Sequence, residues 1–266
     1  MSSLTGLAQC EDLRVTLIQT ATHWHDPVRN RDMFDNWFRH VPQKSQLVVL
    51  PEMFSTGFTM ASSQVAEPMD GPTVEWMCAR AAELNKVVCG SVVIEEDGAF
   101  YNRFLWVTPA GVEGIYDKRH RFRMAGEHQY YSAGAQRLVV ELKGWRLCPL
   151  VCYDLRFPVW LRNRGDYDVL LCVANWPSVR EVAWRALIQA RAVENLAYMV
   201  AVNAVGTDGN DVRYSGGSAV FGPGGEVLVD CGRVEHLTSC TLKAGDLAAF
   251  RDGFPAWQDA DEFQLK

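Results

Sequence analysis

The sequence lacks the features that would place this chain in a membrane, in a secretory route or on nucleic acid. No uncharged stretch approaches the roughly 20 apolar residues that a membrane-spanning helix requires. The N-terminal segment has no basic stretch followed by an apolar one, as a signal peptide would. The net charge of −6 argues against nucleic acid or anionic lipid, since both bind clustered lysine and arginine. We therefore expect a cytoplasmic protein that binds neither nucleic acid nor membrane.

Metal and disulfide patterns are also missing, although the chain contains eight cysteines. Most of them lie in apolar, strand-like stretches such as VVCGSVV and LLCVANW, where a free thiol behaves as a small hydrophobic side chain. No C-x-x-C pair is matched by histidine or cysteine ligands. The chain is far larger than the scaffolds that depend on disulfides. We expect no metal site and no disulfide framework.

No linker, repeat or low-complexity tract divides the chain, so we expect a single domain over residues 1–266. Apolar, β-branched runs alternate with helical stretches, and Glu96-Asp97-Gly98 predicts a hairpin turn. This alternation with hairpins favours an α/β protein with mixed sheets. Strands are expected over 13–20, 47–50, 87–94, 99–107, 137–142, 145–151, 169–174, 197–204, 218–221 and 227–229.

Two helices have clear start signals. Asp26 and Pro27 form an N-cap and first residue, and an apolar face follows at Met33, Trp37 and Val41. A further helix is expected over 73–84. The clearest helix begins at Ser178, which with Glu181 matches a capping box. Its expected apolar stripe consists of Val182, Ala183, Ala186, Leu187, Ala190 and Val193.

A cysteine directly follows one of the predicted strands. Cys152 stands in RLCPLVCYDLRFP, where a helix capped by Asp154 can begin at Leu155. A thiol at such a turn lies near the partial positive charge of helix N–H groups, which favours the thiolate. The backbone N–H of Tyr153 is a candidate donor to an oxyanion beside the sulfur. From this segment alone, Cys152 is better explained as one more buried cysteine, like Cys148.

Charged residues end two other predicted strands. Glu52 follows LVVLP, which places its carboxylate at the sheet edge where α/β proteins form binding crevices. Lys118 ends GIYDK and could supply charge to an oxyanion, and Glu127 could orient it or assist a base. The simpler alternatives are a loop carboxylate, a surface ion pair and a solvated basic run over 118–123.

Together these segments resemble one family. LPE at Glu52, YDK at Lys118 and CYDLRFP at Cys152 are similar to the Glu-Lys-Cys signature of the nitrilase, or carbon–nitrogen hydrolase, superfamily. The order and the separations of 66 and 34 residues also fit. The similarity runs from the first strand to about Gly225 and includes NWP at 175–177. It implies a four-layer αββα sandwich.

The resemblance also implies roles for these residues. Glu52 would take the proton of Cys152, which would attack an amide carbonyl and form a thioester with release of ammonia. Lys118 and the Tyr153 N–H would hold the oxyanion, and Glu127 corresponds to the second glutamate of many relatives. Thiol, carboxylate and ammonium complete this reaction, so no cofactor is implied. Family members associate through helices behind the nucleophile strand, which implies a homodimer or a larger homo-oligomer.

Within the superfamily, CYDLRFPVWLRN, PEMFSTGFTM and AGEHQYYSAG are most similar to the omega-amidase branch. Such enzymes are expected to hydrolyse short 2-oxo dicarboxylate monoamides such as 2-oxoglutaramate. This small-molecule substrate carries a carboxylate, so the pocket needs a cation. Arg156 and His128 are the candidates, although Arg156 is better placed to bind a protein carboxylate. The aromatic candidates, for which core packing is the alternative, are Phe54, Phe58, Tyr130 and Trp176.

Other functions remain open at this point. A nitrilase or another aliphatic amidase would use the same triad. A thiol redox protein would use Cys148 and Cys152, although four residues along one strand exceed disulfide reach. A module that binds anions or nucleic acid would use the basic run 118–123, against the acidic net charge and without interleaved aromatics.

Overall fold

The computed structural model describes residue 7 and residues 9–264, so the ends of the expected domain lie outside the described residues. Its first sheet has the strand order β14-β1-β2-β3-β4-β5. Three parallel strands, β1, β2 and β3, are flanked by antiparallel neighbours. The bounds are β1 (Leu13–Gln19), β2 (Leu47–Val49), β3 (Val87–Glu96), β4 (Ala99–Thr108), β5 (Gly111–Asp117) and β14 (His236–Leu242).

The second sheet repeats this plan with the order β13-β12-β9-β8-β7-β6. Its parallel centre is β7, β8 and β9. A separate hairpin pairs β10 (Val205–Thr207) with β11 (Arg213–Ser215). The bounds of the main strands are β6 (Val140–Leu142), β7 (Trp145–Val151), β8 (Val169–Ala174), β9 (Tyr198–Asn203), β12 (Ala219–Phe221) and β13 (Val227–Asp230).

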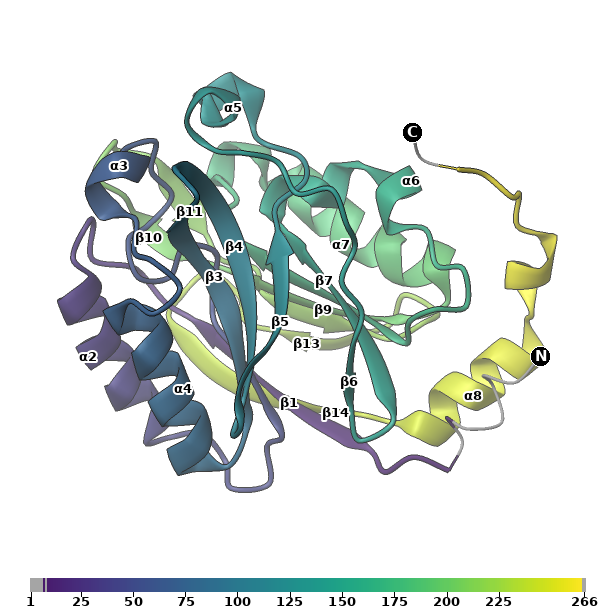
Figure 1. The fold of residues 1–266 in the computed structure, drawn as a ribbon. Helices are drawn as coiled ribbons and strands as arrows, with labels where there is room; N and C mark the ends of the chain where they lie inside the picture. The colour runs from purple at the N-terminus through teal and green to yellow at the C-terminus, as the bar shows by residue number, and fades with distance from the viewer. Residues whose placement is uncertain (1–6, 8, 265–266) are drawn as a thin grey trace.

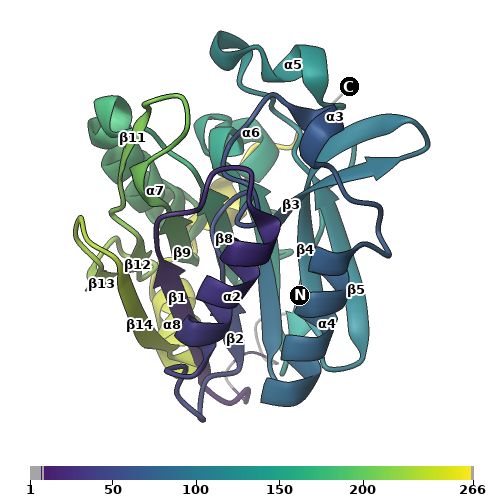
Figure 2. The ribbon, with the colours of Figure 1, turned by 90° about the vertical axis from the view of Figure 1, so that its left-hand side faces the viewer.

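Helices cover the outer faces of both sheets. Figures 1 and 2 show α2 and α4 on one side of the sheets and α6 and α7 on the other. The predicted four-layer αββα sandwich with mixed sheets is therefore confirmed. In the described part of the chain, no helix is both long and apolar enough to cross a membrane. The helices are α2 (Pro27–Phe38), α3 (Ser62–Val65), α4 (Pro72–Leu84), α5 (Glu127–Tyr130), α6 (Pro158–Leu161), α7 (Glu181–Asn195) and α8 (Ala244–Gly253).

Two apolar layers hold the sandwich together. The larger one lies between the sheets, with Phe104 and Trp106 of β4 and Leu147 of β7, and it continues to the buried face of α7, with Ile188. The smaller one fills the space between the first sheet and α2 and α4, and includes Phe34 and Met77. Strands buried on both faces become continuous apolar runs, which is why these segments could be found in the sequence.

The predicted strands are present with small shifts at their ends. Asp26 caps α2 as predicted, accepting from the backbone N–H of Arg29. The predicted apolar face of α2 is partly confirmed, because Met33, Trp37 and Val41 pack half-buried against the core. The helix ends at Phe38, before Val41, and its fully buried positions are Asn30, Phe34 and Phe38. The predicted strand from Arg137 begins only at β6, and β10, β11, β14 and α8 were not predicted.

The largest error concerns α7. Residues 178–180 form a 3₁₀ turn and no side chain caps the helix, so the predicted capping box is wrong. Val182 and Val193 of the predicted buried stripe are 85% and 48% exposed. The helix instead turns Arg191 inward, where its guanidinium donates to the Leu155 carbonyl oxygen at 2.7 and 3.0 Å. The buried residues are Trp184, Ile188, Arg191, Ala192 and Asn195.

Candidate active site

The ends of three strands bring Glu52, Lys118 and Cys152 together. Lys118 directly follows β5 and Cys152 directly follows β7, so the two sheets meet at this point. Met53, next to Glu52, has φ of 41°, and Cys152 has φ of 46°. These left-handed conformations cost energy in residues other than glycine, and they are frequent at functional sites.

Lys118 lies between two carboxylates. Its Nζ is 2.9 Å from Glu52 Oε1, and it is 2.9 and 3.0 Å from the two oxygens of Glu127. The Lys118 side chain is 1% exposed and both carboxylates are fully buried. When all three are ionised, one cation faces two anions without bulk water, so the cluster carries a net negative charge.

The environment shifts the titration of this cluster. Burial acts to lower the pKa of Lys118, but the charges of Glu127 and Glu52 raise it well above its usual value. Lys118 is therefore an ammonium at all working pH values. Burial, helped by the charge of Glu52, raises the pKa of Glu127 even though Lys118 opposes the shift. A proton is thus held more readily by Glu127 than by an exposed glutamate.

The thiol of Cys152 is buried and neutral. Burial first, and then the charge of Glu52, raise its pKa well above the usual value. The predicted stabilisation of a thiolate by a helix is wrong, because residues 152–156 form only a 3₁₀ turn and α6 begins at Pro158. Because the thiol is neutral, it depends on a base at the moment of reaction, and Glu52 is the carboxylate whose charge acts on it.

Asp154 supports the nucleophile turn from behind rather than capping a helix at Leu155. It accepts from the backbone N–H of Val151 at 3.0 Å and from the Tyr116 hydroxyl at 2.7 Å. It also accepts from the His120 backbone N–H at 2.8 Å. Since Tyr116 and His120 flank Lys118, Asp154 ties the Cys152 turn to the loop that carries the lysine.

Two asparagines complete the surroundings of Glu52. The backbone N–H of Asn175 donates to Glu52 Oε2 at 2.8 Å, and its side chain donates to the Glu52 carbonyl at 2.6 Å. Asn102 Nδ2 donates to Glu52 Oε1 at 2.7 Å. Sequence reasoning used NWP as a motif without assigning Asn175, and it missed Asn102. No local pattern marks an amide whose partner is 50 or 123 residues away.

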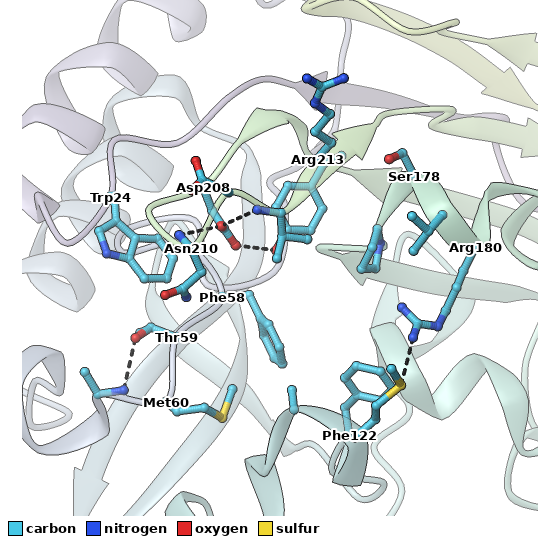
Figure 3. A pocket seen from close by; sticks show the side chains of 18 of the residues that line it. Trp24, Phe58, Thr59, Met60, Phe122, Ser178, Arg180, Asp208, Asn210 and Arg213 are labelled. Carbon is cyan, nitrogen blue, oxygen red and sulfur yellow. Dashed lines mark hydrogen bonds between the residues drawn. The ribbon is translucent and has the colours of Figure 1, made fainter.

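A narrow inner pocket reaches the thiol. Its free volume is about 30 Å³, close to that of one water molecule. It opens into an outer cleft of about 880 Å³, shown in Figure 3. Phe58, Phe122, Pro177 and Arg180 line both spaces and form the boundary between them. The inner pocket is completed by Lys118, Cys152, Tyr153, Arg156, Asn175 and Trp176.

Trp24 forms one wall of the outer cleft (Figure 3). A Cβ atom added at Gly57 would lie 3.0 Å from the indole, and one added at Gly209 would lie 2.3 Å from it. Both glycines therefore leave room that the indole occupies. The ring also stacks on His25 at 4.4 Å between centroids, so its position is closely fixed.

Three of the predicted pocket residues lie in the inner pocket. The Phe58 ring is 5.1 Å from Lys118 Nζ, and Trp176 stacks under the guanidinium of Arg156 at 5.0 Å. The prediction that Arg156 binds a protein carboxylate is wrong, because neither Arg156 nor Arg180 has an ion-pair partner among the described residues. Two uncompensated guanidiniums in an aromatic pocket attract an anion.

The other predicted pocket residues lie elsewhere. Phe54 is fully buried between Phe34 and Trp76, at centroid distances of 5.3 and 5.8 Å, because its side chain points toward the helices. Tyr130 is 48% exposed on α5, and His128 lines neither the inner pocket nor the outer cleft. α5 is a single helical turn, and Glu127 is its one buried residue.

The structure also removes support from the non-enzyme alternatives. The basic run is not one cationic surface: Lys118 is buried, and the guanidiniums of Arg119 and Arg121 donate to the carbonyl oxygens of Gly134 and Tyr131. Cys148 and Cys152 are both free thiols. Within residues 7 and 9–264, no group of three or more side chains is arranged to hold a metal ion.

Comparisons with known proteins agree with this geometry. The chain belongs to the carbon-nitrogen hydrolase family, whose model matches residues 8–252, and it is therefore a hydrolase that acts on carbon–nitrogen bonds. It is 46% identical to "Omega-amidase YafV" of Escherichia coli K12 over 255 residues, covering 95% of this chain and 98% of the relative. It is 29% identical to the "2-oxoglutaramate amidase" of Bacillus subtilis, covering 92% and 96%.

A solved structure is similar over nearly the whole length. XC1258 from Xanthomonas campestris, a CN-hydrolase superfamily protein with an arsenic adduct in its active site, superposes with a TM-score of 0.94. The two sequences are 47% identical, and the match covers 96% of this chain and 100% of that one. The resemblance predicted from the sequence is therefore confirmed at the level of family and fold.

Proposed function

We propose that this protein is an omega-amidase, which hydrolyses the terminal amide of short dicarboxylate monoamides such as 2-oxoglutaramate. The observation that carries the proposal is a thiol beside a buried Glu-Lys-Glu cluster, in a pocket with two uncompensated guanidiniums. The cluster suits amide hydrolysis through a thioester. The guanidiniums suit an acyl chain that ends in a carboxylate. The similarity to omega-amidase YafV and to 2-oxoglutaramate amidase supports the same substrate class.

In this proposal Glu52 takes the proton of Cys152 as the sulfur attacks the amide carbonyl. Lys118 and the Tyr153 N–H stabilise the oxyanion, and the proton then passes from Glu52 to the departing nitrogen, which leaves as ammonia. Glu52 next activates water, which hydrolyses the thioester and releases the acid. Glu127 keeps Lys118 in place and completes the charged cluster. Arg156, stacked on Trp176, binds the substrate carboxylate.

The test is ammonia release from 2-oxoglutaramate, together with intact-mass detection of an acyl adduct on Cys152. We expect both from the wild-type enzyme and neither from Cys152→Ala. Full activity in that variant would exclude the proposal.

A nitrilase or another aliphatic amidase is the second candidate, because the same triad also serves those reactions. A panel of 2-oxoglutaramate, succinamate, glutamine and aliphatic nitriles separates the candidates. We expect the two monoamides to be hydrolysed fastest. Turnover of a nitrile with no turnover of any dicarboxylate monoamide would reject the omega-amidase assignment and leave the triad intact.

Further proposals concern the whole chain. We propose a single domain over residues 1–266 and a homodimer or larger homo-oligomer. The exposed Val179, Val182 and Val193 on and before α7 support association, since such an apolar stripe is costly in water. The free thiols of Cys148 and Cys152 fit the proposed cytoplasmic location. Light scattering on the purified protein tests the oligomer, and a purely monomeric mass would contradict it.

A further inference from the structure

Asn102 bridges the two carboxylates of the buried cluster. It is fully buried on β4, and its Nδ2 lies 2.7 Å from Glu52 Oε1 and 3.5 Å from Glu127 Oε1. Its backbone carbonyl accepts from the Lys118 N–H at 3.0 Å. One residue therefore contacts both carboxylates with its side chain and the lysine with its main chain, and it contacts Glu52 more closely than Glu127.

The amide of Asn102 is used at one end only. Its Oδ1 is buried and has no partner among the described residues. By contrast, Asn163 accepts from the Gly165 N–H and donates to the Tyr167 carbonyl, and Asn30 and Asn203 likewise use both ends. A buried amide that serves packing normally satisfies both of its polar atoms. Asn102 leaves its acceptor Oδ1 unpaired, so we infer that the role of this side chain is the hydrogen bond from Nδ2 to Glu52.

We propose that Asn102 is a positioning residue that keeps Glu52 as the charged proton acceptor and leaves a shared proton on Glu127. The inference rests on the proposed function, in which Glu52 is the base. A short hydrogen bond to a carboxylate stabilises its ionised form, and the donor is 0.8 Å nearer to Glu52 than to Glu127 (3.5 less 2.7 Å). The raised pKa of Glu127 agrees with this division of roles.

The other donors near the cluster divide between the two carboxylates. The backbone N–H of Asn175 donates to Glu52 Oε2 at 2.8 Å, and the backbone N–H of Phe122 donates to Glu127 Oε2. Lys118 Nζ contacts one oxygen of Glu52 and both oxygens of Glu127, so it does not itself favour an ionised Glu52. Tyr131 remains neutral, because burial raises its pKa far above neutrality. The thiols are neutral for the same reason. Burial also raises the pKa of Tyr214 and keeps it neutral. The titratable groups that face the cluster are Glu52, Lys118, Glu127, Tyr131, Cys152, Cys172 and Tyr214.

Two substitutions at Asn102 test the proposal. Asn102→Leu removes the donor at similar volume, and Asn102→Asp replaces it with a third carboxylate. We expect the acidic limb of the pH profile of kcat/KM for 2-oxoglutaramate, where activity falls as the base is protonated, to move up by about one pH unit. At pH values on that limb, this shift lowers kcat/KM by about tenfold. The shift should be larger for Asn102→Asp, while KM stays close to the wild-type value. If the leucine variant does not fold, Asn102→Ala removes the same donor without added bulk.

A second measurement separates this inference from the proposed function. The rate of Cys152 alkylation by iodoacetamide, followed by peptide mass spectrometry over pH, needs no substrate and should show the same shift. The matched control is Asn163→Asp, which changes a buried amide outside the site and should lower Tm without moving the limb. If the pH profiles of kcat/KM and of Cys152 alkylation are the same in all Asn102 variants as in the wild-type protein, the proposal is overturned. A wild-type enzyme inactive on every monoamide would instead overturn the proposed function, and the alkylation profiles would still decide the role of Asn102.

Discussion

The two sheets have the same plan but make different contributions to the site. The first sheet and its loops supply the charged residues Glu52, Lys118 and Glu127, together with the neutral amide of Asn102 that donates to Glu52. The second sheet and its loops supply the nucleophile and pocket walls, with Cys152 behind β7 and Asn175 behind β8. The contact between Glu52 and Asn175 joins the two sets. Because neither sheet holds both a base and a nucleophile, the site forms only when the sheets pack.

Removing the contribution of the second sheet should have the largest effect. Cys152→Ala is expected to reduce ammonia release at least about 10⁴-fold, because the covalent path is lost. The charged cluster of the first sheet remains, so the variant should still bind 2-oxoglutaramate in calorimetry. Loss of binding as well would mean that the thiol helps to hold the ground state.

Removing the cation of the first sheet should cost less activity but more stability. Lys118→Met is expected to lower kcat by about 10²–10³-fold, as for the loss of an oxyanion donor. It should also lower the unfolding free energy by about 3–5 kcal/mol, because two buried carboxylates lose their partner. Adding Glu127→Gln should restore part of the stability, measured by urea unfolding, without restoring activity. No gain in the double variant would show that Glu127 is not held mainly by the lysine.

The second sheet also contributes a cation to the inner pocket, since Arg156 belongs to the same turn as Cys152. Arg156→Met is expected to lower kcat/KM for 2-oxoglutaramate by about 10–100-fold, the value of one hydrogen bond to a charged group. A neutral amide such as butyramide serves as the control, and its kcat/KM should hardly change. If kcat/KM fell equally for both substrates, Arg156 would maintain the conformation of the turn and would not bind the substrate carboxylate.

The opposite end of the second sheet provides a contrast in stability alone. Asp168, just before β8, lies 2.8 Å from Arg146 and 2.7 Å from Arg251. Burial opposes ionisation, yet the two arginines hold its pKa below the usual value. A depressed carboxyl pKa stabilises the fold above the unfolded-state value and loses this effect as pH falls, here below about pH 4.

Asp168→Asn should therefore lower the unfolding free energy at pH 7 by about 3–5 kcal/mol. The difference from the wild-type protein should shrink below about pH 4. Activity at 25 °C should be kept, since Asp168 lies far along β8 from Asn175. A constant difference across pH would show that the arginines stabilise the fold without ionised Asp168.

The sequence predicted those features of the fold and site that depend on residues close together in the chain. Long apolar runs predicted the strands, and a charged residue or cysteine at the end of a run predicted where Glu52, Lys118 and Cys152 would converge. The family resemblance added the four-layer arrangement. Phe54 was assigned to the pocket because it follows Glu52 closely, yet the left-handed turn at Met53 sends it toward the helices.

The sequence was uninformative wherever a polar side chain is buried through a distant partner. Arg191 and Asn195 face inward on α7, so counting apolar residues selected a stripe that includes the exposed Val182 and Val193. Asn102 and Asn175 were missed for the same reason, since their partner Glu52 is far away in the chain. The thiolate prediction failed because it considered the turn and not the burial of Cys152.

The fixed position of the Trp24 indole ties the shape of the outer cleft to two glycines. Gly57 lies in the loop after β2 and Gly209 in the loop after β10, so the indole packs between a loop of the first half of the chain and a loop of the second half. Any side chain at Gly209 must displace that ring and so reshape the outer cleft, while the thiol and the charged cluster stay as they are. Variation at one exposed loop position is thus a short route to new substrate ranges, open to natural drift and to laboratory evolution alike.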